Sequence, residues 1–232
     1  MKYLTEADIR AMRLADGAAL LLPADRALGP LAQEYCARRG IRVEKPSHGE
    51  MAMGTPKDAQ AGFINAETGQ HMTEKPEHMT HLNGNLLVPK THQRIRLRGK
   101  LDSLQAQLLL AARQAIDAQR PETAAALEEF HAFAQTILGC EVTDQPLPPY
   151  TLLGLDDAGL RRASHRPQEF AGMPHPMPHS GMPPLCLTLN FLRTQVREAE
   201  LCAVEAERPD LIQALNRFSS AVYLLFLKEL SS

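Results

Sequence analysis

The sequence has no tryptophan, and aromatic residues of all kinds make up only 5% of its 232 residues. Hydrophobic residues still account for 44% of the chain, so the core must draw mainly on leucine, alanine and isoleucine. That composition favours helices over a β-sandwich. The sequence also lacks any apolar run close to the roughly 18 residues that a membrane helix needs. We therefore expect a globular, mainly α-helical protein that does not cross a membrane.

An excess of charge of one sign is also absent. The formal net charge is −2, so no overall basic field argues for binding to nucleic acid or to an anionic membrane. The first residues, MKYLTEADIR, lack the apolar segment of a signal peptide, and we expect a cytoplasmic location. The four cysteines are scattered, form no C-x-x-C pair and are expected to be reduced thiols: Cys36, Cys140, Cys186 and Cys202.

Two long amphipathic segments stand near the end of the sequence, Leu185–Ala206 and Pro209–Leu230. In each, apolar residues recur at steps of three and four, which places them on one face of a helix. The break between the segments is short, and Pro209 suits the first turn of a helix, where no backbone N–H donor is needed. The pattern predicts an antiparallel pair of helices.

The polar residues of this pair have an unusual spacing. Arg193 and Arg197 are four residues apart, so both guanidinium groups project from one helix face. Two such groups suit a polyphosphate, because each can bind two oxygens at once. Asn216 and Ser220 are spaced in the same way on the second helix. Ordinary solvated helix faces are the alternative interpretation.

These segments resemble a known family. Leu192–Glu200 (LRTQVREAE) followed by Leu215–Tyr223 (LNRFSSAVY) is similar to the C-terminal helical pair of ATP:corrinoid adenosyltransferases, above all the ethanolamine-utilisation type and also the propanediol-utilisation type. Arg98–Leu104 (RGKLDSL) and Lys75–Leu82 (KPEHMTHL) resemble upstream segments of the same enzymes. Several motifs in the right order are more specific than one short pattern. The resemblance implies an up-and-down bundle of about five helices.

The rest of the chain divides by composition. Residues 1–45 are expected to form a small α/β lobe, which serves either to dock a partner or shell or as a purely structural element. Glycine and proline interrupt residues 46–80, which we interpret as a linker or flexible insertion. The resemblance then implies that residues 81–232 form the helical-bundle adenosyltransferase domain. Within it, a hairpin is expected at Asn83-Gly84, and helices are expected over about Leu97–Ala118 and over Pro121–Leu138, with Gly139 ending the second.

The segment Pro89–Asp102 is the most basic of the chain. Lys90 and Thr91 precede a predicted helix, and a loop that leads into a helix N-terminus is a natural phosphate site. In the family, a polar loop before this helix cradles the triphosphate, which makes Lys90 and Thr91 candidate ligands. The resemblance also pairs Asp102 with Arg197 across a subunit contact beside the nucleotide. An ordinary surface aspartate in the first turn is the alternative.

One departure from the family concerns metal. The ethanolamine type carries a histidine followed by C-C-x-x-C, and the matching positions here fall near Phe63, Ile64 and Glu67, where no thiolate is available. A cysteine-rich metal site is therefore not expected. The region also contains three histidines: His71, His78 and His81. They are either surface residues or the nitrogen ligands of a substitute metal site, and we assign none of them as a metal ligand.

The resemblance implies transfer of the 5′-deoxyadenosyl group of ATP to Co(I) of cobalamin, with Mg²⁺ and with triphosphate as the leaving group. The implied catalytic residues are Arg193, Arg197 and Asp102. Cofactor-binding candidates are Lys90, Thr91, Arg193, Arg197, Glu200 and Asn216. Phe170 is a further candidate: it would lie behind a Pro-rich loop, Met173–Pro184, and form an apolar wall against the corrin ring.

The implied partners are a reductase that supplies Co(I), and further copies of the chain. A trimer is favoured and a dimer is the alternative. The product would serve a B12-dependent lyase, in the cytoplasm or in a bacterial microcompartment. Two other functions stay open: a non-catalytic escort that binds ATP or adenosylcobalamin, and an interaction protein of a microcompartment.

Overall fold

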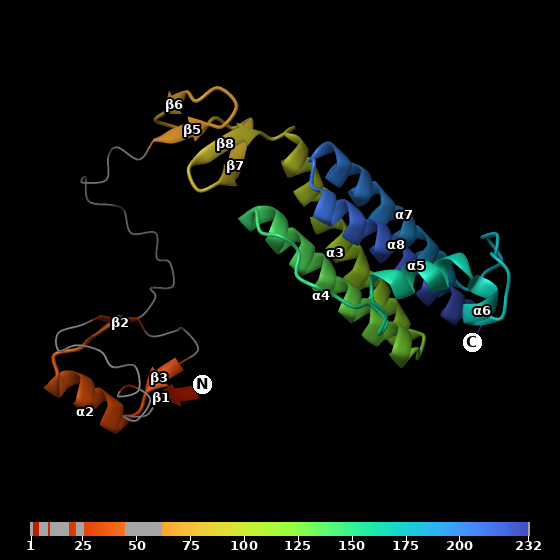
Figure 1. The fold of residues 1–232 in the computed structure, drawn as a ribbon, viewed down its shortest axis with the longest axis horizontal. Coiled ribbons are helices and arrows are strands. Elements are labelled where there is room, and N and C mark those ends of the chain that lie inside the picture. Colours follow the sequence, from red (N-terminus) through yellow and green to blue (C-terminus); the bar gives the residue numbers. More distant parts are fainter. Residues whose placement is uncertain (1, 5–8, 10–18, 22–25, 45–61, 232) are drawn as a thin grey trace. The chain divides into compact units, whose positions relative to one another are not determined.

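The computed structural model describes residues 2–4, 9, 19–21, 26–44 and 62–231 (Figure 1). The chain divides into two compact units, Met1–Ala59 and Gln60–Ser232. The second unit holds four long helices and two short ones, which confirms the mainly α-helical fold class expected from composition and resemblance. Among the described residues, no helix combines the length and the apolar character required to span a bilayer.

The described part of the first unit contains short strands and a helix. Strand β1 (Lys2–Leu4) pairs in parallel with β3 (Arg26–Leu28), and β2 (Ala19–Leu21) pairs in parallel with β4 (Arg42–Glu44). Helix α2 (Pro30–Arg38) starts on a proline, and Gly40 just beyond its C-cap has a φ of +63°. This is the small α/β lobe predicted from the sequence. Its small core consists of Ile9, Leu20, Leu28, Ala32, Cys36 and Ile41.

The second unit begins with a four-stranded sheet in the order β6-β5-β8-β7. Its strands are β5 (Phe63–Asn65), β6 (His71–Met72), β7 (Met79–Asn83) and β8 (Leu86–Pro89). The hairpin between β7 and β8 turns at Gly84, whose φ is +53°, as the Asn83-Gly84 pair predicts.

Residues 62–80 therefore require a correction. The sequence analysis placed them in a linker, whereas they supply β5, β6 and the start of β7. The strands are only two to five residues long, too short for a clear alternation of apolar and polar residues, and the intervening glycines mark their turns. The remainder of that predicted linker, residues 46–61, lies outside the described residues.

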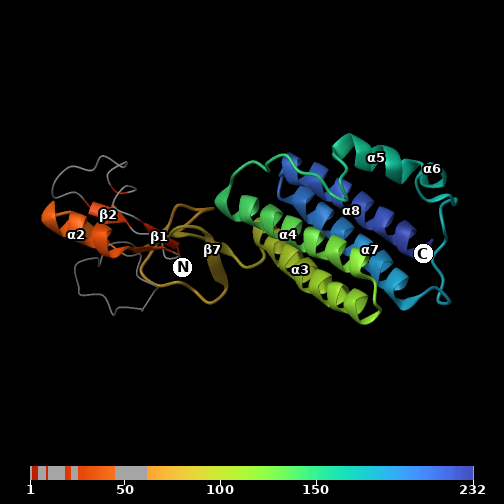
Figure 2. The same cartoon turned by 90° about the horizontal axis from the view of Figure 1, so that it is seen from below.

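The bundle consists of α3 (Gln93–Asp117), α4 (Pro121–Thr143), α7 (Pro184–Glu205) and α8 (Pro209–Leu230). The short helices α5 (Asp157–His165) and α6 (Pro167–Ala171) pack against α8 (Figure 2). Helices α3 and α7 run antiparallel. The start of α3 lies beside the end of α7, and the end of α3 lies beside the start of α7. The first of these contacts is an Arg96–Glu205 ion pair at 2.8 Å.

Helix α4 is longer than predicted. It continues through Gly139 to Thr143, and its C-cap is Asp144 in the left-handed conformation, with a φ of +56°. A glycine inside a helix costs only about 1 kcal/mol, which tertiary contacts easily exceed. The important tertiary contact here is made by Glu141, which lies within one turn of the observed end of α4. Its side chain is fully buried.

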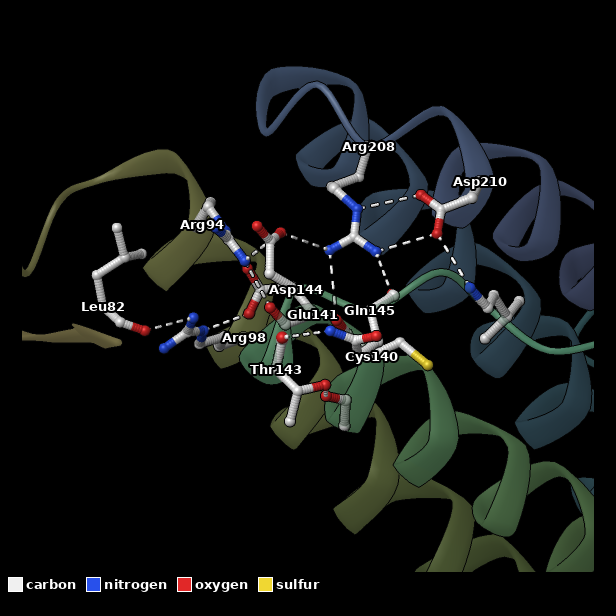
Figure 3. A network of polar contacts seen from close by, with 12 residues as sticks. Leu82, Arg94, Arg98, Cys140, Glu141, Thr143, Asp144, Gln145, Arg208 and Asp210 are labelled. Carbon is white, nitrogen blue, oxygen red and sulfur yellow. Dashed lines mark hydrogen bonds and ion pairs between the residues drawn. The ribbon is translucent and has the colours of Figure 1, made fainter. Parts of the chain in front are cut away.

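The carboxylate of Glu141 receives hydrogen bonds from two guanidinium groups of α3, Arg94 Nε and Arg98 Nε. Arg98 also donates to the backbone carbonyl of Leu82 in β7 at 2.9 Å (Figure 3). One buried carboxylate thus joins the sheet, the start of α3 and the end of α4. A buried carboxylate is costly without partners, and the two arginines supply its hydrogen bonds and its counter-charge.

The same end of the bundle is tied to α8. Arg208 donates to the backbone carbonyl of Gln145 at 3.0 Å and pairs with Asp210 at 3.0 Å (Figure 3). Its hydrogen bond holds the pKa of the Asp210 carboxyl below the usual range. We call the joined side chains the Glu141 network: Arg94, Arg98, Glu141, Asp144, Arg208 and Asp210.

Replacing Glu141 by glutamine is expected to lower the free energy of unfolding by about 3 kcal/mol, because two partly buried guanidinium groups lose their shared counter-charge. Urea unfolding followed by helical circular dichroism measures the change. Glu128→Gln on an exposed position of the same helix is the control, with an expected effect below about 0.5 kcal/mol. Equal stability of the two variants would contradict the importance of this network.

Candidate functional site

Helices α5, α7 and α8 line two pockets that follow one another along α8. The first has a volume of about 380 Å³ and receives Arg193 and Arg197 from α7, Ser219 and Tyr223 from α8, and His175 from the segment between α6 and α7. We call it the arginine pocket. The second, of about 550 Å³, is one helical turn further toward the start of α8, and we call it the Glu200 pocket; it is lined by Asp157, Arg161, Glu200, Asn216 and Arg217, among others.

The two arginines predicted from their spacing do share one pocket. Arg193 is half-buried and donates to Asn190 Oδ1 at 3.2 Å. Arg197 is exposed and makes no hydrogen bond or ion pair with any residue that the structure describes. Burial, together with the positive charge of Arg197, lowers the pKa of the Arg193 guanidinium. Two neighbouring cations that no described carboxylate neutralises are a site at which an anion would be stabilised.

A tyrosine and a histidine close one side of the arginine pocket. The Tyr223 hydroxyl shares a hydrogen bond with His175 Nδ1 at 2.6 Å, and the two rings stack with their centroids 5.7 Å apart. Burial raises the pKa of Tyr223, so its phenol stays protonated at neutral pH. The contact holds the segment between α6 and α7 over the pocket. Tyr223 was not among the candidate ligands predicted from the sequence.

Glu200 and Asn216 face each other in the Glu200 pocket. The Asn216 side-chain amide donates to Glu200 Oε1 at 2.9 Å, and Arg217 donates to Asn216 Oδ1 at 2.6 Å. Arg217 also pairs with Asp157 at 3.0 Å. The structure therefore brings together these two predicted residues, beside the arginine pocket rather than inside it.

Lys90 and Thr91 lie elsewhere in the same unit. They follow β8 and precede α3, whose start lies beside Glu205 at the end of α7. Arg197 is eight residues before Glu205, about 12 Å along the helix axis. Neither Lys90 nor Thr91 lines the arginine pocket.

The basic segment that suggested a phosphate loop is largely compensated. Lys90 pairs with Glu77 at 2.8 Å, which lowers the pKa of that carboxyl. The other cations of the segment also have carboxylate partners within the described residues: Arg94 and Arg98 at Glu141, Arg96 at Glu205, and Lys100 at Glu198. The sequence could not show these partners, because they lie far away along the chain.

Asp102 does not meet Arg197 within one chain. Lys100, which pairs with Glu198, marks the side of α3 that faces α7. Asp102 is two residues further on, about 200° around the helix, and its side chain is exposed. The pairing that the resemblance implies stays a prediction about a second copy of the chain.

Phe170 lies in α6, outside both pockets. It is partly buried against the core of the bundle, and Lys228 Nζ lies 5.7 Å from the centre of its ring. Its role as an apolar wall for a corrin ring stays a prediction. Among the described residues, no group of three or more His, Cys, Asp and Glu side chains is arranged to hold a metal ion, and the three histidines considered as a substitute site lie in that part of the chain: His71, His78 and His81.

Comparison with known proteins gives a consistent result. Residues 71–229 match the family model described as cobalamin adenosyltransferase. The chain is 30% identical to the corrinoid adenosyltransferase EutT of Escherichia coli (strain K12), and 29% identical to that of Salmonella typhimurium (strain LT2), in each case over 97% of this chain and 91% of the relative. No solved structure matches the chain significantly.

The arginine pocket is expected to bind inorganic tripolyphosphate. Arg197→Gln should weaken that binding about tenfold, because one charge-assisted contact of about 1.4 kcal/mol is lost. Isothermal titration calorimetry at constant ionic strength measures the change. Arg38→Gln is the matched control, since Arg38 is an exposed cation of α2, in the first unit. An identical affinity in both variants would place the anion outside this pocket.

Proposed function

Because the chain belongs to the cobalamin adenosyltransferase family and is a transferase that acts on a corrinoid, we propose that it transfers the 5′-deoxyadenosyl group of ATP to Co(I) of cobalamin. The electron pair of Co(I) forms the bond to the ribose C5′. The bond between C5′ and the triphosphate oxygen breaks, and its electron pair leaves with triphosphate. The products are adenosylcobalamin and inorganic triphosphate.

This reaction asks little of the protein in acid–base chemistry, since Co(I) carries its own electron pair. The protein must instead hold cobalt and C5′ in line at close distance and exclude water. It must also stabilise the negative charge that grows on the leaving triphosphate. The observation that carries the proposal is the pair Arg193 and Arg197, two adjacent guanidinium groups of which Arg197 makes no hydrogen bond or ion pair with the described residues.

Mg²⁺ fits the neighbouring Glu200 pocket. The Glu200 carboxylate is a hard donor of the kind that Mg²⁺ prefers, and an ion that arrives with ATP needs only one or two protein oxygens. The Asn216 amide oxygen is not assigned to the ion, because it accepts a hydrogen bond from Arg217. When bound, Mg²⁺ would neutralise part of the phosphate charge. Asn216 and Glu200 orient each other through their hydrogen bond, and Arg217 holds the Asn216 side chain from the other side.

The corrinoid would occupy the side of the arginine pocket that His175 and Tyr223 close. The Pro-rich segment there, with Phe170 behind it, would form a wall that excludes water from cobalt. A reductase must supply the electrons that convert resting cobalt to Co(I), and a B12-dependent lyase, in the cytoplasm or in a microcompartment, would use the product.

We assign Lys90, Thr91 and Asp102 to the site of a neighbouring copy of the chain. All three are exposed, and none reaches the arginine pocket of its own chain. The face of α3 that carries Asp102 also exposes three large aliphatic side chains, an arrangement that suits burial between subunits: Leu109 (45%), Leu110 (72%) and Ile116 (52%). A homo-oligomer with shared sites, a trimer by analogy with the propanediol type, would bring Asp102 to Arg197.

The reaction is tested by ATP-dependent alkylation of chemically reduced cobalamin under anaerobic conditions with Mg²⁺, followed by visible spectroscopy. A light-sensitive adenosylcobalamin spectrum is expected. Arg197→Gln should lower kcat about 10²- to 10³-fold, because charge on the leaving group is no longer stabilised. Arg38→Gln should keep full activity. Binding of adenosylcobalamin without any turnover would point to an escort instead, and absence of ATP and corrinoid binding to an interaction protein.

Site sharing is tested by mixing two variants. Asp102→Ala and Arg197→Ala should each be nearly inactive alone, and subunit exchange between them should restore activity, because some sites then combine an intact Asp102 with an intact Arg197. Mixing Arg193→Ala with Arg197→Ala is the control and should restore nothing, since both residues come from the same α7. A fully active monomer by light scattering would rule out the shared site.

A further inference from the structure

Asp157, at the start of α5, is a charged side chain of the Glu200 pocket to which the proposed reaction gives no role. It lies in the first turn of the helix, next to Asp156. The Asp156 side chain accepts a hydrogen bond from the Gly159 N–H at 2.8 Å and so caps the helix. The start of α5 therefore does not depend on the Asp157 carboxylate, whose contacts are made with α8 instead.

Two side chains of α8 hold the Asp157 carboxylate. Gln213 donates to Oδ1 at 3.0 Å, and Arg217 Nε lies 3.0 Å from Oδ2. Burial raises the pKa of the Asp157 carboxyl, but the hydrogen bond from Gln213 and the neighbouring charges of Arg217 and Arg161 outweigh burial, so the pKa lies below its usual value. Asp157 is therefore ionised at neutral pH and provides the counter-charge for two arginines.

Arg217 is the arginine that most needs this counter-charge. Only 12% of its side chain is exposed, so water hydrates its guanidinium poorly, and a buried charge without a partner is costly. Arg217 also donates to Asn216 Oδ1 at 2.6 Å, and the Asn216 amide donates to Glu200 Oε1 at 2.9 Å. A single side chain thus separates the Arg217 guanidinium from the Glu200 carboxylate.

The Glu200 pocket has two charges of each sign. Among the described residues that line it, Arg161 and Arg217 are the cations, and Asp157 and Glu200 are the carboxylates. Without the charge of Asp157, Glu200 is the carboxylate left in that lining. Arg161 is exposed and can be hydrated, so Arg217 is the cation that would turn to Glu200. A guanidinium group would then occupy the carboxylate oxygens that a divalent cation needs.

We propose that Asp157 is a positioning residue that holds Arg217 away from Glu200, and so keeps the Glu200 carboxylate available to the Mg²⁺ that enters with ATP. This inference rests on the proposed function, which assigns Glu200 to the ion. Asp157 acts through Arg217 and contacts neither the ion nor ATP. Its effect should therefore appear in the metal-dependent part of ATP binding, and removal of the Arg217 charge should make Asp157 dispensable.

The test measures ATP binding to the full chain by isothermal titration calorimetry, once with Mg²⁺ and once with EDTA and no divalent cation. Asp157→Asn keeps the size of the side chain and removes its charge. It should weaken ATP binding with Mg²⁺ about fivefold, as expected when a part-exposed ion pair competes with the ion for one carboxylate. Binding with EDTA should change less than about twofold, because no ion then needs Glu200. Glu34→Gln, which removes an exposed carboxylate of α2 in the first unit, is the control.

A second substitution distinguishes positioning from damage to the fold. In the double variant D157N/R217Q, ATP affinity with Mg²⁺ should return to within about twofold of the wild-type value, because position 217 no longer carries a guanidinium that could pair with Glu200. In Glu200→Gln, adding Asp157→Asn should have no further effect, because the carboxylate that Asp157 keeps available is absent.

Three results would overturn the inference. Equal weakening with Mg²⁺ and with EDTA would show that Asp157 supports ATP binding or the fold as a whole. Unchanged binding in Asp157→Asn would show that Arg217 stays in place without Asp157. Failure of D157N/R217Q to regain affinity would show that Arg217 does not compete with the ion.

These measurements also separate the inference from the proposed function, because they require neither corrinoid nor turnover. A loss of affinity in Asp157→Asn that is specific to Mg²⁺, and that Arg217→Gln repairs, supports the positioning role even if no adenosyl transfer is found. Adenosyl transfer by the wild type, together with Mg²⁺-dependent ATP binding that is identical in Asp157→Asn, would leave the transferase in place and refute the positioning role.

Discussion

The buried carboxylate of Glu141 is the contact on which the second unit most depends. It has no exposure to solvent, so it is stable only because Arg94 and Arg98 share it. Those two arginines fix the first turns of α3, and Arg98 fixes β7 through the Leu82 carbonyl. Because Arg208 binds the adjacent end of α4, the same few side chains also set where α8 begins. The sheet, the long helices and the groove along α8, which consists of the arginine pocket and the Glu200 pocket, are thereby held in fixed positions relative to one another.

Helix α8 shows how the core positions the candidate site. The Phe218 ring packs edge-to-face on Phe130 and on Phe133, with centroids 5.4 Å apart in both pairs. The next two residues, Ser219 and Ser220, already line the arginine pocket. A rotation of α8 that moved the polar groove would also pull an aromatic ring out of a close-packed core. Close packing of the hydrophobic interior therefore keeps the groove rigid.

Sequence reasoning worked where a local pattern was long. The apolar periodicity of α7 and α8 predicted both helices, and the spacing of Arg193 and Arg197 placed them together. It failed where the information is not local. The strands at residues 63–72 are too short to show a period, and the basic segment before α3 looked free because its carboxylate partners are distant. His175 and Tyr223, 48 residues apart, become neighbours only in the folded chain.

The charges around the start of α3 are balanced and those along the groove are not, and this difference affects the rate at which an anion binds. Around the start of α3, each cation from Lys90 to Lys100 is matched by a nearby carboxylate, so its field decays within a short distance. Along the groove, Arg193 and Arg197 have no carboxylate partner among the described residues. A diffusing anion thus experiences attraction toward one side of this unit before any contact forms. Electrostatic attraction therefore steers the anion toward this side of the unit, and the rate of association falls as ionic strength rises.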